Sequence, residues 1–191
     1  MAEKEQEGIV AFCPGCGDNV STYEVKRDGV VEVRCNFCGL TLEQAVFDDV
    51  KETECILVAE DSELIRLMLN DALVENNIAR KIVTSVNGFD FVTKLTDRFE
   101  KREPVDLVIL DIQMPIMSGI NAALALRAIE TGFQRENRRI PILFFSVKKC
   151  DDTLLKVMKF CTPAQYVNKG TSDSKEQLFG RIKQVLAQLL K

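Results

Sequence analysis

The chain of 191 residues has 46% hydrophobic and 28% charged side chains, a composition that is typical of folded globular proteins and excludes disorder throughout. Its 25 Lys and Arg against 29 Asp and Glu give a net charge of -4, so no overall basic field exists to hold a nucleic acid. The sequence contains no histidine, which excludes histidine bases and ligands. It has no apolar run near the roughly 18 residues that span a membrane, and its start is acidic where a signal peptide is basic. We therefore expect a cytoplasmic protein without membrane insertion.

Four of the seven cysteines form two pairs with the same spacing. Cys13 and Cys16 are followed by Gly17, and Cys35 and Cys38 are followed by Gly39. Two thiolates on one tight turn can both reach a tetrahedral ion, and four thiolates close its coordination sphere. The spacing therefore predicts a structural Zn²⁺ site with the ligands Cys13, Cys16, Cys35 and Cys38.

Between the two cysteine pairs the sequence predicts a β-hairpin, with alternating strands at 21–26 and 30–34 and a turn at 27–29. Residues 1–50 would then be a small β-rich zinc ribbon preceded by an acidic tail. This segment has four basic and ten acidic side chains. A local charge of this sign disfavours nucleic-acid binding and favours docking to another protein.

From residue 53 to the end of the chain, short apolar runs alternate with amphipathic stretches of helical period. This alternation predicts a second domain, 53–191, with an α/β fold, an open doubly wound sheet of five parallel strands in which each strand is followed by a helix. The expected strands are 55–59, 81–86, 105–110, 140–145 and 165–168, and the expected helices are 63–76, 89–100, 121–131, 153–160 and 174–191.

Polar side chains stand at the carboxyl ends of four of these strands, where ligands bind in such sheets. Glu60 and Asp61 follow the first strand, Asp111 the third, Ser146 the fourth and Lys169 the fifth. Three carboxylates that converge on one rim repel one another unless a cation neutralises them, and oxygen ligands suit Mg²⁺. Asp111 would then be a nucleophile toward a phosphoryl group, with Ser146 and Lys169 placed to hold phosphoryl oxygens.

These residues carry a resemblance to a known family, the receiver domains of bacterial two-component response regulators of the chemotaxis Y-protein type. The resemblance covers residues 54–191 and implies a flavodoxin-like (βα)5 fold. It rests on four segments in order: 56–62 (ILVAEDS), 108–115 (VILDIQMP) with Ser118 and Gly119, 144–146 (FFS), and 166–169 (YVNK).

The resemblance also implies roles for individual residues. Asp111 would accept the phosphate, and Asp61 would bind Mg²⁺ directly, with Glu60 acting through water and the backbone carbonyl of Gln113 adding a ligand. Ser146 would be the switch hydroxyl. Tyr166 would be its aromatic partner, which turns inward when Ser146 moves to the phosphoryl group.

Only 22 residues follow Lys169, and the last expected helix uses them, so we expect no separate C-terminal output domain. The predicted function is that of a phosphoacceptor rather than an enzyme. A histidine kinase or phosphotransfer protein would phosphorylate it, and a downstream protein would read the face built by helix 153–160, strand 165–168 and helix 174–191.

Two alternatives stay open. The ribbon could instead contact nucleic acid or the transcription machinery, as many ribbons do. The receiver could also be a scaffold that works without phosphorylation, since Gly170 and Val147 stand where the family usually has proline and a small residue. A phosphatase of the haloacid-dehalogenase type is excluded because it needs a second acid where this chain has Gln113. A nucleotide-binding sheet is excluded because its first turn would be rich in glycine.

Overall fold

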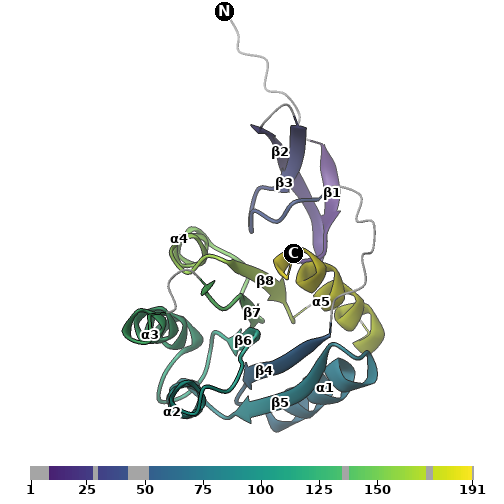
Figure 1. Cartoon of the computed structure of the whole chain (residues 1–191). Coiled ribbons are helices and arrows are strands. Elements are labelled where there is room, and N and C mark those ends of the chain that lie inside the picture. Colours follow the sequence, from purple (N-terminus) through teal and green to yellow (C-terminus); the bar gives the residue numbers. More distant parts are fainter. Residues whose placement is uncertain (1–8, 28–29, 43–51, 135–137, 171–173, 191) are drawn as a thin grey trace, which may run out of the picture.

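The computed structural model describes residues 9–27, 30–42, 52–134, 138–170 and 174–190. The acidic tail and residues 28–29 of the predicted turn lie outside these ranges. Two sheets form within them, a three-stranded antiparallel sheet near the start of the chain and a five-stranded parallel sheet after it (Figure 1). None of the helices in the described part of the chain is both long and apolar enough to cross a membrane.

The parallel sheet has the strand order β5-β4-β6-β7-β8. After the first strand, β4, the chain adds β5 on one side and then β6, β7 and β8 on the other. This order confirms the predicted doubly wound fold and places the topological switch point between β4 and β6. The strands are β4 (Thr53–Ala59), β5 (Ala79–Ser85), β6 (Leu107–Asp111), β7 (Ile142–Ser146) and β8 (Ala164–Asn168).

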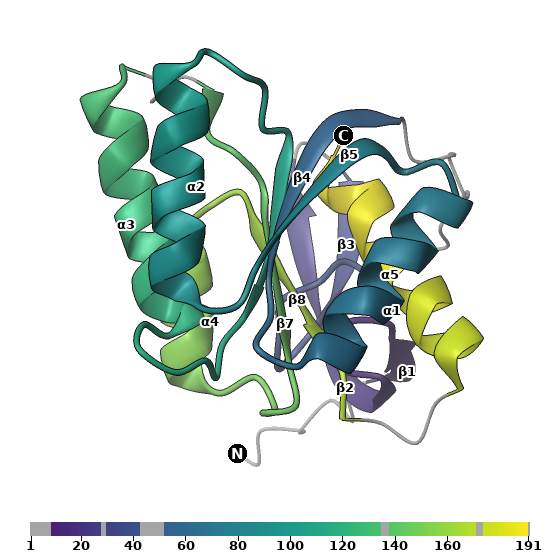
Figure 2. The same ribbon diagram turned by 90° about the horizontal axis from the view of Figure 1, so that it is seen from below.

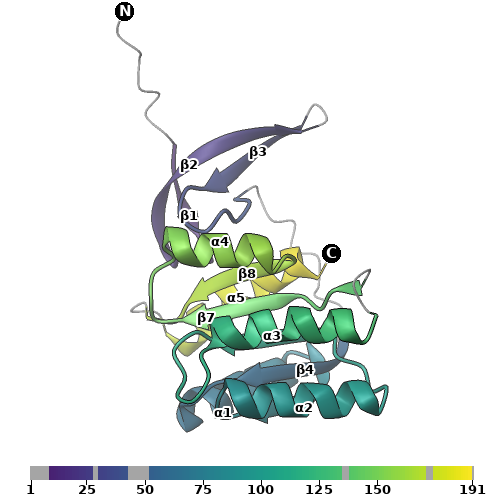
Figure 3. The same cartoon turned by 90° about the vertical axis from the view of Figure 1, so that its left-hand side faces the viewer.

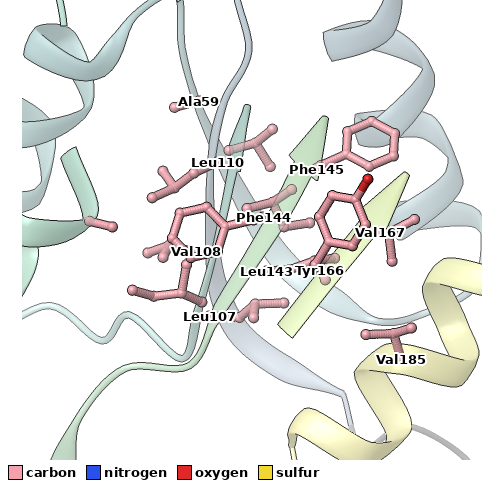
Figure 4. Close-up of a cluster of buried hydrophobic side chains, with 14 of the residues drawn as sticks. Ala59, Leu107, Val108, Leu110, Leu143, Phe144, Phe145, Tyr166, Val167 and Val185 are labelled. Atoms are coloured by element: carbon pink, nitrogen blue, oxygen red, sulfur yellow. The ribbon is translucent and has the colours of Figure 1, made fainter. Parts of the chain in front are cut away.

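Helices cover both faces of this sheet. Figure 2 shows α1 and α5 on one face and α2, α3 and α4 on the other. Every residue of β6 and β7 is buried, as expected for central parallel strands that are covered on both sides. Figure 4 shows the core between the layers, where Phe144 and Tyr166 lie among aliphatic side chains. The helices are α1 (Glu63–Glu75), α2 (Gly88–Glu100), α3 (Gly119–Gly132), α4 (Asp152–Phe160) and α5 (Lys175–Leu189).

Each helix begins just after a polar residue whose side chain accepts a hydrogen bond from a backbone N–H of the first turn. This arrangement satisfies one of the donors that a helix start leaves unpaired, and it explains why the helices begin where they do. In α5 the capping box is complete, because the side chain of Gln177 accepts a hydrogen bond from the backbone N–H of Ser174. The capping residues are Ser62, Asn87, Ser118, Asp151 and Ser174.

A buried ion pair ties α3 to neighbouring elements. The Nη1 atom of Arg127 lies 2.7 Å from Oε2 of Glu130, and both side chains are almost fully buried. Arg127 also donates to the carbonyls of Ile140 and Cys161, and Glu130 accepts from the Ile140 N–H. Because all these partners are satisfied, the pair fixes the end of α4 and the start of β7 against α3.

The N-terminal sheet has the order β1-β2-β3, with β1 (Val10–Cys13), β2 (Asp18–Arg27) and β3 (Val30–Cys35). The pairing of β2 with β3 confirms the predicted hairpin. Gly17 and Gly39 have φ values of 70° and 72°, in the left-handed region that favours glycine. Their N–H groups donate to the carbonyls of Cys13 and Cys35, which closes each cysteine turn.

This small sheet, which we call the ribbon, lies against β8, α4 and α5 (Figures 1 and 3). The N–H of Asn168 donates to the carbonyl of Gly15 at 2.7 Å, and Gln188 of α5 donates to the carbonyl of Thr41 at 3.1 Å. The ribbon therefore covers the face on which the sequence led us to place a downstream protein. The sequence did not indicate where the ribbon would lie, and the reading of this face by a downstream protein stays a prediction.

Candidate functional site

The predicted acidic residues meet at the carboxyl edge of the parallel sheet. Glu60 and Asp61 follow β4, and Asp111 ends β6, the strand that pairs with β4. One carboxylate oxygen of each residue lies within 4.8 Å of the others. Glu60 and Asp111 are only 1% and 3% exposed, whereas Asp61 is exposed. The three form a cup that opens to solvent on the side of Asp61.

Lys169 reaches into this cup from the end of β8. Its Nζ atom lies 2.8 Å from Oε2 of Glu60 and 3.1 Å from Oδ2 of Asp111. Burial raises the pKa of Glu60, and the ammonium of Lys169 opposes this effect. One ammonium facing three carboxylates leaves excess negative charge, so the cup suits a further cation.

Backbone contacts fix the acidic side chains in place. The N–H of Gln113 donates to Oδ1 of Asp111 at 3.3 Å, and the N–H of Ser62 donates to Oε1 of Glu60 at 3.2 Å. The start of α3 presses on the same strand end, since a Cβ at Gly119 would lie 2.0 Å from the carbonyl oxygen of Asp111. The predicted role of the Gln113 carbonyl as a metal ligand stays a prediction.

The predicted switch residues, Ser146 and Tyr166, lie beside the cup, and both form hydrogen bonds with the backbone of Lys148. Ser146 is fully buried at the end of β7, and its Oγ atom accepts from the N–H of Lys148 at 3.2 Å. The hydroxyl of Tyr166 points toward the carboxyl ends of the strands (Figure 4) and donates to the carbonyl of Lys148 at 2.6 Å. The N–H of Lys169 donates to the carbonyl of Ser146, which places both residues on the rim of the cup.

The donor set of the cup fits a hard divalent cation. It offers only oxygen atoms, two of its carboxylates are held by backbone N–H groups, and Asp61 faces solvent, where water can complete an octahedron. Neither a thiol nor an imidazole belongs to this cluster, so it does not favour Zn²⁺.

The four ribbon cysteines form a second cluster that could hold a metal, with their Sγ atoms within 4.8 Å of one another. The Sγ atoms of Cys13 and Cys38 are 3.5 Å apart, and those of Cys16 and Cys35 are 3.7 Å apart. A tetrahedron with metal–sulfur bonds of about 2.3 Å has sulfur–sulfur edges of about 3.8 Å, so these spacings fit a tetrahedral ion. The N–H groups of Cys16, Phe37 and Cys38 donate to sulfur atoms of Cys13 and Cys35, and such bonds orient thiolates and stabilise their negative charge.

The other three cysteines are buried and lie outside this cluster. Burial raises the pKa of Cys55 and Cys161, and it raises that of Cys150 to about 12. A buried thiol with a raised pKa is inert, in keeping with a packing role.

The fold and the acidic rim together define a doubly wound domain with a ligand site at its switch point, and comparison with known proteins gives the family. The sequence model described as "Response regulator receiver domain" matches residues 56–182. The chain therefore belongs to the response regulator receiver family, which confirms the resemblance seen in the sequence.

Curated relatives agree with this assignment over part of their length. The chemotaxis protein CheY of Bacillus subtilis is 35% identical over 75 residues, which are 39% of this chain and 58% of that protein. A protein-glutamate methylesterase/protein-glutamine glutaminase of Clostridium acetobutylicum is 34% identical over 91 residues, which are 48% of this chain but 23% of the relative. The chain thus spans less than two thirds of either relative.

Solved structures show the same fold. The response regulator TrrA of Thermotoga maritima, solved in complex with Mg²⁺ and beryllium fluoride, is 26% identical, with a TM-score of 0.54 over 72% of this chain and 100% of that one. The response regulator domain of Thermotoga maritima CheB is 17% identical, with a TM-score of 0.55 over 72% of this chain and 96% of that one. At that identity CheB supports the fold alone.

Two residues near the site were not singled out from the sequence. Asn168 donates from Nδ2 to the Tyr166 hydroxyl at 2.7 Å and from its backbone to the ribbon. Arg181 of α5 donates to the carbonyls of Asn168 and Pro14. Asn168 could have been noticed because it precedes Lys169, but Arg181 had no signal beyond its place on a helix.

Proposed function

We propose that this chain is a phosphoacceptor in a two-component system, with Asp111 as the residue that receives the phosphoryl group. The observation that carries the proposal is the position of the Lys169 ammonium, within 3.1 Å of Asp111 and 2.8 Å of Glu60 in a rim of three carboxylates. A cation of this kind beside a buried carboxylate is placed to stabilise the charge of a transferring phosphoryl group.

In the proposed reaction a carboxylate oxygen of Asp111 attacks the phosphorus atom in line with the donor bond. The new P–O bond forms as the bond to the donor breaks, and the leaving group departs with its electron pair. Lys169 and the hydroxyl of Ser146 then hold phosphoryl oxygens, with Ser146 as the switch residue and Tyr166 as its aromatic partner. Asp61, Asp111, the carbonyl of Gln113 and, through water, Glu60 would hold Mg²⁺, which would supply charge neutralisation between the two anions.

The partners follow from this chemistry. The phosphoryl donor would be a histidine kinase or a phosphotransfer protein, because this chain has no histidine of its own. The signal would leave by contact with another protein, so that the chain is a signalling phosphoprotein and not an enzyme. The methylesterase activity of some relatives is not carried over, since the chain matches only 23% of the Clostridium protein.

We further propose that the four ribbon cysteines hold a structural Zn²⁺, and that residues 1–50 and 53–191 are two domains. The sulfur spacings support the metal. The few buried apolar side chains of the ribbon support a structural role, because a module of this size gains on the order of 10 kcal/mol of folding free energy from zinc.

The test is phosphorylation by a small donor. Incubation with acetyl phosphate and Mg²⁺ is expected to add one phosphate to the intact protein by mass spectrometry. Asp111→Asn should abolish the adduct, and Asp97→Asn, at an exposed position on α2, should leave it unchanged. Equal labelling of wild type and Asp111→Asn would remove Asp111 from the role. No labelling of the wild type would favour the scaffold alternative.

A further inference from the structure

The ribbon adds its first cysteine turn to the free edge of the parallel sheet. β8 is the last strand in the order, and on its outer side the N–H of Asn168 donates to the carbonyl of Gly15 at 2.7 Å. Gly15 lies between the metal-binding positions Cys13 and Cys16. An edge strand exposes unpaired backbone groups, and here one of them is paired with the cysteine turn itself.

Contact at this point is too close for any side chain larger than glycine. A Cβ at Gly15 would lie 2.8 Å from the carbonyl oxygen of Tyr166 and 3.3 Å from the Sγ atom of Cys38. Arg181 closes the junction from α5, because its Nη1 atom donates to the carbonyl of Pro14 and its Nη2 atom to the carbonyl of Asn168. The cysteine turn and the end of β8 are therefore held as one unit.

This unit is directly connected to the phosphorylation site. Asn168 precedes Lys169, whose ammonium lies between Glu60 and Asp111. The side chain of Asn168 donates to the Tyr166 hydroxyl, which donates to the carbonyl of Lys148, two residues after Ser146. Tyr166 also lines a cavity of about 160 Å³ whose opposite wall is the ribbon, with Cys16, Val20 and Phe37.

We propose that the ribbon is a regulatory ligand of its own receiver, so that its docking on β8, α4 and α5 and the phosphoryl group on Asp111 stabilise each other. The inference rests on the proposed function of Asp111. The cysteine site then acts as a second input, because only a folded ribbon presents the Gly15 carbonyl to Asn168.

The sign of the coupling follows from the contacts. A docked ribbon fixes Asn168, and through it the backbone of Lys169 and the hydrogen bonds of the Tyr166 hydroxyl. Groups that are already in place when charge develops need no reorganisation, so docking favours the phosphorylated state. Linkage then requires that the phosphoryl group tightens docking by the same factor, typically about 5- to 150-fold for coupled sites.

A test separates docking from folding. Leu155 of α4 lies beside Gly39, in a groove that also contains Arg34 and Lys159. Leu155→Lys replaces an apolar contact with an ammonium that docking would have to remove from water, so it should undock the ribbon without touching the phosphorylation site. The matched control is Leu124→Lys, at an exposed position of α3. Figure 3 shows this helix away from the ribbon.

Two readouts are needed on the full chain, loaded with zinc: the hydrogen exchange rate of the Asn168 amide by NMR, and the affinity for beryllium fluoride with Mg²⁺ as a phosphoryl mimic. In wild type and Leu124→Lys, beryllium fluoride should slow Asn168 exchange at least about 5-fold. In Leu155→Lys the amide should exchange faster and beryllium fluoride should bind more weakly by a similar factor. Chelation of the zinc should reproduce both effects.

The outcomes distinguish this inference from the proposed function. If the wild type binds beryllium fluoride but Asn168 exchange is then unchanged or faster, the coupling is overturned and the phosphoacceptor role stays intact. The coupling is also overturned if the Asn168 amide exchanges faster only in Leu155→Lys while both variants bind beryllium fluoride with equal affinity. If the wild type binds neither beryllium fluoride nor a phosphoryl group, both proposals fail together.

Discussion

Replacing Gly119 by alanine tests how tightly the backbone holds the proposed phosphoacceptor. The added Cβ would lie 2.0 Å from the carbonyl oxygen of Asp111 and 2.8 Å from its carbonyl carbon, both of them backbone atoms that cannot rotate away. Real Cβ contacts essentially never fall below 3.0 Å. The start of α3 and the end of β6 must therefore move apart by about 1 Å, a misplacement that can cost about 100-fold in a positioned reaction.

The matched control is the same substitution at the other end of the same helix. A Cβ at Gly132 meets nothing within 4 Å. Gly132→Ala should therefore raise the free energy of unfolding by up to about 1 kcal/mol, whereas Gly119→Ala should lower it by about 1 to 3 kcal/mol through overpacking.

The assays are urea unfolding and the rate of labelling by acetyl phosphate with Mg²⁺, followed by intact mass. We expect Gly132→Ala to label at the wild-type rate and Gly119→Ala to label about 100 times more slowly. Labelling of Gly119→Ala within about twofold of wild type, with unaltered unfolding, would show that Asp111 does not depend on this contact.

Three further changes probe other parts of the molecule. Arg127→Ala should lower the free energy of unfolding by about 3 to 5 kcal/mol in urea titrations, because it leaves the buried carboxylate of Glu130 unpaired, whereas Lys101→Ala at an exposed pair should change it by less than about 1 kcal/mol. Cys38→Ser should abolish stoichiometric zinc by metal analysis while the receiver amides other than that of Asn168 stay protected from exchange; loss of protection in β4, β6 and β7 would show that the receiver needs the ribbon to fold. Ser146→Ala should weaken beryllium fluoride binding by about 10-fold in a fluorescence titration, from the loss of one hydrogen bond to a charged group, and unaltered affinity would remove Ser146 from the site.

The parallel sheet could be predicted because its strands are continuous apolar runs between amphipathic helices. The five predicted strands all exist, and all of their ends agree within two residues. The start of β7 is Ile142 and not residue 140, because Ile140 donates its N–H to Glu130 instead of joining the ladder. The short β1 strand escaped prediction, since the pattern of Val10–Cys13 is too short to show a period.

The acidic rim was predictable for a topological reason. In a parallel sheet the strands all end at one edge, so polar residues just after separate strands must converge, however far apart they are in sequence. Glu60, Asp111 and Lys169 come together in this way. No such rule links the ribbon to the receiver: the contact of Gly15 with Asn168 depends on shape and on backbone groups that every residue carries.

That contact also bears on how the signal can leave the protein. If a partner reads the face formed by β8, α4 and α5, it must displace the ribbon and break the bonds from Asn168 and Arg181. If instead phosphorylation tightens docking, as we propose, this face is least accessible in the phosphorylated state. The partner would then read apolar side chains of the docked ribbon that stay accessible, such as the half-exposed Phe12. Phe12→Ser should therefore impair output without altering the labelling of Asp111.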